Sequence, residues 1–326
     1  MTVLIDAKGV TKHFPVETGG FLRRTTIPLR AVENVDLQIM AGETLGLVGE
    51  SGCGKSTLGR VLIRLIAATD GSILFDGVDI LKLDAQRLRE TRRAMQIIFQ
   101  DPYGALNPRM TVEDIIQEPL AIHGIAPGDA VTRMLDLVGL PARARERFPH
   151  EFSGGQRQRI GIARALILRP KFVVCDEPVS ALDVSVQAQI VNLMSDLQRE
   201  LALTYLFIAH DLGVVKHIST RVAVMYLGKV VELADKKTLY DRPRHPYTQA
   251  LIAAVPVAHP AQRRRETRDR NRLPGDIPSA LHPPSGCRFH TRCPYVMPIC
   301  KVQEPKVEAI EPGHLVACHL MTTTAA

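Results

Sequence analysis

Gly49-Glu50-Ser51-Gly52-Cys53-Gly54-Lys55-Ser56 is the stretch that decides the fold of this chain. It fits the pattern G-x-x-x-x-G-K-[ST], in which the glycines let backbone amides face phosphate groups and the lysine reaches the β- and γ-phosphates. Thr44 to Val48 precedes it as a buried strand, and Leu58 to Ile66 follows with helical spacing. This order predicts a nucleoside triphosphate site, with these candidate binding residues: Gly49, Ser51, Gly52, Cys53, Gly54, Lys55, Ser56 and Thr57.

Two further apolar runs end in polar residues, as central strands of a parallel sheet do at their carboxyl edge. Phe172 to Cys175 is followed by Asp176 and Glu177, and Tyr205 to Ala209 is followed by His210. A carboxylate after such a strand holds Mg²⁺ in nucleotide hydrolases, so Asp176 and Ser56 are predicted magnesium ligands. If the phosphate-binding loop were absent, Asp176 and Glu177 would instead fit a solvated turn, and His210 would fit a structural role.

The remaining segments predict the other parts of an α/β fold. Val32 to Ile39 alternates apolar and polar residues as a half-exposed antiparallel strand does. Residues 101–170 have a helical pattern and no strong strand run, which predicts an insertion between core strands. Beyond Pro256 the sequence is rich in proline and arginine, and we expect an irregular extension there. The predicted domains are therefore residues 1–258 and 259–326.

The composition excludes several classes of protein. The chain has 326 residues, of which 45% are hydrophobic, and no run reaches the roughly 18 apolar residues that a membrane-spanning helix needs. We therefore expect a protein of the cytoplasm. A net charge of +7 is mild, and part of the excess lies in Arg263 to Arg265. Because aromatic residues are only 5% and tryptophan is absent, stacking on nucleic acid is not expected.

A third set of residues narrows the class of hydrolase. Phe152-Ser153-Gly154-Gly155-Gln156 stands shortly before the strand that ends in Asp176, and Ser180 to Asp183 follows that strand. With Gln100 and His210, these residues are similar in order and spacing to an ATP-binding cassette (ABC) ATPase. The resemblance spans essentially the whole chain. It implies a P-loop core with an antiparallel β subdomain, an inserted helical subdomain and a cysteine-bearing extension.

The resemblance also implies a role for each matching residue. Glu177 would polarise the attacking water, His210 would contact the γ-phosphate, and Gln100 would bind Mg²⁺ and link it to the transport subunits. The signature residues would contact the nucleotide of an opposite subunit in a head-to-tail dimer. Phe14 falls where the family has an aromatic that stacks on adenine, although a lone aromatic there also fits the core. The implied partner-facing residues are Ser153, Gly154, Gly155, Gln156 and Asp183.

Three segments point to one branch of this family. His245 to Leu251, Gln100 to Pro108 and Val224 to Lys229 resemble ATPase subunits of dipeptide and oligopeptide importers, in particular the second ATPase subunit of dipeptide importers. This implies a similar ATPase partner, two membrane-spanning permeases and a substrate-binding protein, at the cytoplasmic face of the membrane. The cargo stays open among dipeptides, longer peptides, nickel complexes and glutathione.

Four of the six cysteines lie near the end of the chain, at Cys287, Cys293, Cys300 and Cys318. Four thiolates can hold zinc or a 4Fe-4S cluster, and the wide C-x5-C-x6-C-x17-C spacing favours the cluster over a zinc ribbon. Related peptide-importer ATPases carry such a cluster, so the resemblance implies one here. Unligated thiols are the third interpretation.

Two rival functions fit part of this pattern. A soluble ABC ATPase that acts on nucleic acid also combines a nucleotide site with iron-sulfur ligands, but such proteins usually carry two nucleotide domains in one chain. An iron-sulfur redox enzyme with ATP as an effector is the other rival, but no flavin or nicotinamide fingerprint accompanies the cysteines.

Overall fold

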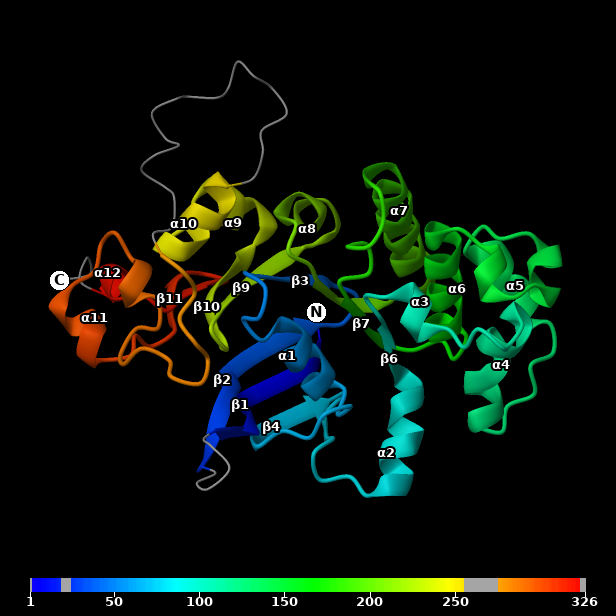
Figure 1. Cartoon of the computed structure of the whole chain (residues 1–326), viewed down its shortest axis with the longest axis horizontal. Helices are drawn as coiled ribbons and strands as arrows, with labels where there is room; N and C mark the ends of the chain where they lie inside the picture. The colour runs from blue at the N-terminus through cyan, green and yellow to red at the C-terminus, as the bar shows by residue number, and fades with distance from the viewer. Residues whose placement is uncertain (1, 19–24, 255–274, 323–326) are drawn as a thin grey trace, which may run out of the picture.

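The computed structural model describes residues 2–18, 25–254 and 275–322. Its strands form two sheets, one of four strands and one of eight. The smaller sheet lies beside α1 (Lys55–Leu62), and the helical insertion and the carboxyl-terminal region lie at opposite ends of the larger sheet (Figure 1).

The smaller sheet is antiparallel and has the order β2-β1-β4-β5. Its strands are β1 (Val3–Thr18), β2 (Thr25–Met40), β4 (Asp70–Phe75) and β5 (Val78–Asp79). The alternation over Val32 to Ile39 predicted part of β2, and the apolar members of that stretch are buried. The prediction of an antiparallel strand there is confirmed.

The larger sheet has the order β11-β12-β10-β9-β3-β8-β7-β6. Five of its strands run parallel: β9 (Arg221–Tyr226), β3 (Thr44–Val48), β8 (Thr204–Ile208), β7 (Phe172–Asp176) and β6 (Met95–Ile98). Every residue of β3, β7 and β8 is buried, as expected for central parallel strands. Around the sheet pack α1, α7 (Val184–Leu201) and α8 (Leu212–Ile218), whereas α2 (Ala85–Thr91), which has no buried residue, projects away from it below β6.

The predicted helix over Leu58 to Ile66 is longer than the observed one. Helix α1 ends at Leu62, and Arg64 has a φ of 52°, a left-handed conformation that no α-helix can contain. The Arg64 side chain donates hydrogen bonds to the carbonyl oxygens of Ile80 and Leu83, which fix the turn. Apolar spacing alone could not show this tertiary contact.

The helical insertion lies between β6 and β7 and forms one end of the molecule (Figure 1). Residues 99–171, all of which the structure describes, contain no strand, so that prediction is confirmed. The helices there are α3 (Pro102–Ala105), α4 (Val112–Ile122), α5 (Ala130–Leu137) and α6 (Gly154–Leu166), with short 3₁₀ turns at Ala142–Glu146 and Pro149–Glu151.

The carboxyl-terminal region, here called the tail, comprises the described residues 275–322 and is more regular than expected. After β10 (Lys229–Asp235), α9 (Lys236–Asp241) and α10 (Pro246–Ala253), it contains α11 (Pro298–Val302), β11 (Glu308–Glu311), β12 (His314–Val316) and α12 (His319–Thr322). Strand β12 pairs with β10, with Glu232 opposite Val316. The expectation of an irregular extension fits residues 275–297, which contain only one short 3₁₀ turn, but it misses β11 and β12, which continue the main sheet.

Some expectations concern residues outside the described ones. The boundary between residues 258 and 259 and the basic run Arg263 to Arg272 lie within residues 255–274. Among the helices of the described residues, none combines the length and apolar character needed to cross a membrane.

Candidate nucleotide site

The phosphate-binding loop connects β3 to α1, as the sequence predicts. Gly54 stands at the helix N-cap with a φ of 105°, and a Cβ there would lie 2.1 Å from the Ala31 carbonyl oxygen. Glycine is thus required by both conformation and space. The free amides at the start of α1 face an anion-binding position, which is what a phosphate-binding loop provides.

Lys55 is held in the middle of this loop. Its side chain is buried, with 4% of the residue exposed, and its ammonium donates to the carbonyl oxygens of Gly49 at 2.8 Å and Glu50 at 3.0 Å. Cys53 is also buried, and burial raises the pKa of its thiol. The cysteine therefore packs as a small apolar residue, while Lys55 supplies the positive charge.

A cavity of about 590 Å³ opens over the loop. Its wall collects predicted residues from well-separated segments, including Phe14, Lys55, Gln100, Glu177 and His210. The other predicted loop residues in the wall are Ser51, Gly52, Gly54, Ser56 and Thr57. The sequence analysis did not identify Leu29, Ala31 and Ala280, which also line the cavity and carry no motif.

Two of the predicted magnesium ligands, Ser56 and Asp176, lie next to each other. The Ser56 hydroxyl donates to Asp176 at 2.6 Å, and the carboxylate of Asp176 is 1% exposed. Arg60 forms an ion pair with the second carboxylate oxygen at 3.0 Å. Hydroxyl and carboxylate oxygens are ligands that Mg²⁺ prefers, and few protein ligands suffice when phosphates supply others. The donor set therefore fits magnesium.

Glu177 contacts two other polar residues that line the cavity, Gln100 and His210. Its backbone has a φ of 49°, a left-handed conformation that is rare for a residue with a side chain and often occurs at functional sites. The same carboxylate oxygen is 3.2 Å from the amide nitrogen of Gln100 and 3.2 Å from Nδ1 of His210. Three residues predicted from separate motifs thus form one hydrogen-bonded group.

The signature residues lie at the starts of two helices, outside the wall of this cavity. Ser153 caps α6, and its side chain and that of Gln156 exchange hydrogen bonds with each other's backbone amides. Asp183 caps α7, and its hydrogen bond with the Ser185 hydroxyl lowers the pKa of its carboxyl. A Cβ on Gly155 would lie 2.4 Å from Val186, so glycine lets the two helices approach.

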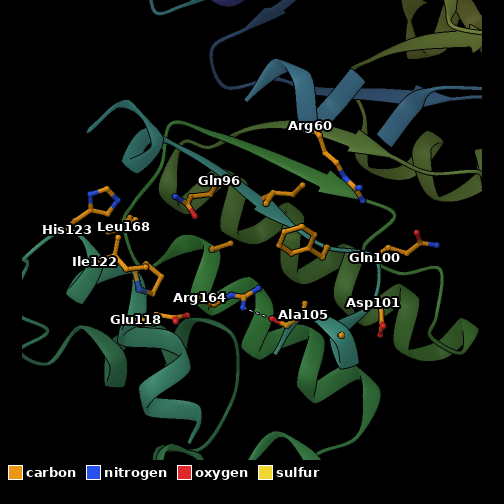
Figure 2. Close-up of a pocket in the computed structure, with 15 residues that line it drawn as sticks. Arg60, Gln96, Gln100, Asp101, Ala105, Glu118, Ile122, His123, Arg164 and Leu168 are labelled. Atoms are coloured by element: carbon orange, nitrogen blue, oxygen red, sulfur yellow. Dashed lines mark hydrogen bonds between the residues drawn. The ribbon is translucent and has the colours of Figure 1, made fainter. Parts of the chain in front are cut away.

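A second cavity, of about 630 Å³, lies between the larger sheet and the helical insertion (Figure 2). Gln100 lines both cavities, and Arg60, which contacts Asp176, lines the second. Apolar side chains such as Ile122 and Leu168 form part of its wall, and Arg164 donates to the Ala105 carbonyl oxygen at 2.6 Å. The second cavity is thus linked by side chains to both carboxylates of the nucleotide site.

The four tail cysteines are free thiols in the described region. Burial, together with the charges of neighbouring tail cysteines, raises the pKa of Cys287 to about 12 and that of Cys318 to about 11. The four thiols therefore lie near one another. In the described part of the chain, no group of three or more histidine, cysteine or acidic side chains is placed so that it could hold a metal ion.

Comparisons with known proteins agree with this geometry. Residues 32–180 match the ABC transporter family. A dimeric structure of the ATP-binding cassette MJ0796 bound to ADP and phosphate covers 71% of this chain and 98% of its own, with 29% identity and a TM-score of 0.62. CbiO1 of Clostridium perfringens, part of the ABC transporter complex cbiONQ, covers 74% and 92% at 25% identity and a TM-score of 0.63. The fold and site thus define an ABC ATPase.

Two further matches identify the branch. Residues 231–300 match the carboxyl-terminal region of oligopeptide/dipeptide transporters. The oligopeptide transport ATP-binding protein AppF of Bacillus subtilis is 53% identical over 322 residues, which cover 97% of each chain. The chain therefore belongs to the ATP-binding proteins of the oligopeptide/dipeptide ABC transporters.

Proposed function

We propose that this chain hydrolyses ATP to drive the uptake of dipeptides or oligopeptides through a membrane-bound ABC importer. The carrying observation is the group formed by Glu177, Gln100 and His210 at the wall of the cavity over the phosphate-binding loop. AppF, a relative of this chain, is an oligopeptide transport ATP-binding protein, which supports a peptide cargo.

Each residue of the site has one task in this proposal. Lys55 and the loop amides bind the phosphates, Phe14 stacks on the base, and Ser56 with Asp176 holds Mg²⁺, which screens phosphate charge. Glu177 orients and polarises the attacking water, and His210 donates to the γ-phosphate. Because Gln100 contacts Glu177, a shift of Gln100 repositions the catalytic carboxylate.

The site is completed by a second, similar ATPase subunit. Ser153 and Asp183 are exposed and stand outside the cavity wall, so they are free to contact a nucleotide held by a partner. The dimeric MJ0796 relative supports this arrangement. We infer a heterodimer of two ATPase subunits, in which each phosphate-binding loop faces the signature residues of the other.

Two permease subunits and a substrate-binding protein are the other proposed partners. The second cavity is the proposed permease contact, because its wall residues Arg60 and Gln100 touch the carboxylates of the nucleotide site. A permease segment bound there would act on Asp176 through Arg60 and on Glu177 through Gln100. This places the chain at the cytoplasmic face of the membrane as a peripheral subunit.

We further propose that the tail cysteines hold a 4Fe-4S cluster, with a zinc ion as the alternative bound group. Their mutual proximity supports this, and all four are free thiols. A tetrahedral zinc site would bring four sulfurs to about 2.3 Å from one ion. The four cysteines are a suitable set of donors for such a cluster, and the proposed role of the cluster is structural.

Reconstitution tests the transport proposal. The chain is assembled with its permeases and ATPase partner in proteoliposomes, and uptake of labelled dipeptides and longer peptides is measured with ATP inside or outside. Uptake coupled to hydrolysis is expected. Hydrolysis without peptide uptake, together with salt-sensitive nucleic-acid binding, would favour the rival function. Anaerobic purification with iron and zinc analysis tests the cluster, and absence of both metals contradicts it.

A further inference from the structure

Arg292 of the tail forms an ion pair with the phosphate-binding loop. Its two terminal nitrogens donate to the two carboxylate oxygens of Glu50 at 2.7 and 3.1 Å. The arginine side chain is only 6% exposed and that of Glu50 is 24% exposed. A bidentate pair with so little solvent contact is stronger and more directional than a surface ion pair.

Glu50 is also tied through its backbone. Its amide donates to the buried Tyr247 hydroxyl at 2.8 Å, and its carbonyl oxygen accepts from Lys55 at 3.0 Å. Phe289 of the tail packs against Tyr247, with ring centroids 5.5 Å apart. The tail therefore reaches Glu50 twice, through the charge of Arg292 and through the aromatic support of Tyr247.

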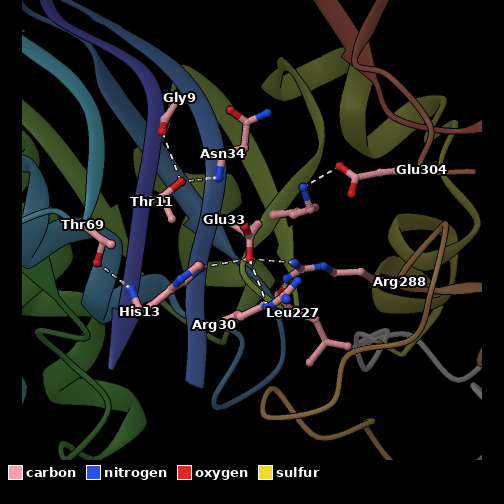
Figure 3. Close-up of polar contacts among 11 residues, drawn as sticks. Gly9, Thr11, His13, Arg30, Glu33, Asn34, Thr69, Leu227, Arg288 and Glu304 are labelled. Atoms are coloured by element: carbon pink, nitrogen blue, oxygen red, sulfur yellow. Dashed lines mark hydrogen bonds and ion pairs between the residues drawn. The ribbon is translucent and has the colours of Figure 1, made fainter. Parts of the chain in front are cut away.

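A second arginine of the same tail segment contacts β2, the strand whose residues Leu29 and Ala31 line the nucleotide cavity. Arg288 donates to Glu33 on β2 at 3.2 Å and to the carbonyl oxygen of Leu227 (Figure 3). Glu33 also lies 3.1 Å from His13, the neighbour of Phe14. Burial opposes the charge of Glu33, but His13 and Arg288 lower its pKa overall, so it stays ionised.

Two backbone hydrogen bonds add further links, one to the phosphate-binding loop and one between β2 and the tail. The Gly228 amide, next to Leu227, donates to the Cys53 carbonyl oxygen in the loop at 2.8 Å. The Ala280 carbonyl oxygen accepts from the Arg30 amide at 3.2 Å, and Ala280 itself lines the cavity. The tail thus contacts Glu50 of the loop through Arg292 and contributes Ala280 to the cavity wall.

We propose that the tail segment Cys287 to Cys293 is a brace for the nucleotide site and that Arg292 is a positioning residue for ATP, acting through Glu50. Neither Arg292 nor Glu50 is among the described residues that line the cavity. The effect of Arg292 on nucleotide affinity passes through the backbone of Glu50, whose carbonyl oxygen accepts a hydrogen bond from the Lys55 ammonium. The inference rests on the proposed nucleotide site and assigns the tail a role in setting nucleotide affinity.

The test measures binding of N-methylanthraniloyl-ATP with Mg²⁺ to the full chain by fluorescence. Arg292→Gln should raise the dissociation constant about tenfold, since it removes two charged hydrogen bonds and leaves an unpaired carboxylate in the loop. Glu50→Gln should raise it less, and Arg292→Gln with Glu50→Gln should be no weaker than Arg292→Gln alone. Arg292→Lys keeps the charge and should recover part of the affinity.

A matched control breaks another tail ion pair. Glu311→Gln removes the contacts of Glu311 with Arg242 at 3.3 Å and Arg244 at 3.4 Å, which lie outside the nucleotide cavity, and should leave nucleotide affinity unchanged. In the assembled complex, Arg292→Gln should raise KM for ATP and leave kcat within about twofold, since Arg292 does not line the site. If Glu311→Gln weakened nucleotide binding as much as Arg292→Gln, the loss of any tail ion pair, and not the contact with Glu50, would explain the effect.

The outcomes separate this inference from the proposed site. An unchanged dissociation constant in Arg292→Gln, additive effects of the Arg292 and Glu50 substitutions, or an equal effect of Glu311→Gln overturns the brace alone. If Lys55→Ala binds the nucleotide as tightly as the wild type, the proposed nucleotide site is wrong and the brace with it. Should Arg292→Gln fail to fold, Glu50→Gln and Arg292→Lys carry the test.

Discussion

The two edges of the phosphate-binding loop differ in how they are built. On the cavity side, short polar contacts join residues that follow strands, such as Glu177 and His210, and His210 is 59% exposed. On the tail side, buried side chains such as Phe289 and Arg292 are held by packing and ion pairs. The cavity side is arranged for chemistry and the tail side for support, so substitutions on the two sides should affect different measurements.

The largest expected effect is on the cavity side, at Glu177. Glu177→Gln should lower ATP turnover about 10³-fold, because the amide cannot accept the proton of the attacking water. Nucleotide affinity should stay within about threefold, since the lysine and the loop amides are unchanged. Phosphate release by the assembled complex and nucleotide binding are measured together.

The exposed Glu200→Gln substitution serves as the control for this prediction and should change neither quantity. Phosphate release at the wild-type rate by the Glu177 variant would falsify the assigned role of Glu177. It would also remove the contrast between the two edges.

On the tail side, the largest expected effect is on stability. Phe289 is 2% exposed and packs against Tyr226, with ring centroids 5.2 Å apart. Phe289→Ala should lower the free energy of unfolding by about 3 kcal/mol. The exposed Tyr295→Ala, in the same tail, should change it by less than about 0.5 kcal/mol. Urea unfolding compares the two variants, and equal losses would contradict tight packing of the tail.

Acid should also weaken the tail side, through His245. This residue is 1% exposed, and burial lowers its pKa from 6.5 to about 3. The unfolded chain binds the proton more readily, so the stability contribution is complete above about pH 6.5 and is lost as the pH falls towards 3.

The slope of this loss should be about 1.4 kcal/mol per pH unit inside that window. His245→Asn is the matched variant, because asparagine caps a helix well but does not titrate, and His245 caps α10 by accepting from the Tyr247 amide. The variant should lose less stability than the wild type between pH 6.5 and 5. Parallel unfolding curves for both proteins would contradict the prediction.

The smallest expected effect is at the exposed end of the tail. Glu311→Gln should change the free energy of unfolding by only a few tenths of a kcal/mol, since the Arg242 and Glu311 side chains are 59% and 37% exposed and salt screens the pair. Thermal unfolding at low and high salt checks this. A loss above about 1 kcal/mol would show that the tail depends on surface charge as well as on packing.

The sequence predicted the cavity side far better than the tail side. The loop, Asp176 and the strands that precede the catalytic residues carry local patterns, and parallel strands bring their carboxyl ends together. Strand β12 has only three residues, too few to show a period, and depends on distant contacts such as the 2.8 Å contact between Nε2 of His314 and the Glu232 carboxylate. Likewise, nothing local marks Ala280 as a cavity residue or pairs Arg292 with Glu50.

The pairing of β12 with β10 has a consequence for how the protein is made. Strand β10 is largely buried, and without β12 its row of amides and carbonyls would be an open edge able to pair with other chains. That edge is closed by residues synthesised well after β10. The outer strand is then β11, which is short and carries Glu308 and Glu311. A chain that is interrupted before β12 therefore presents an open edge that favours aggregation.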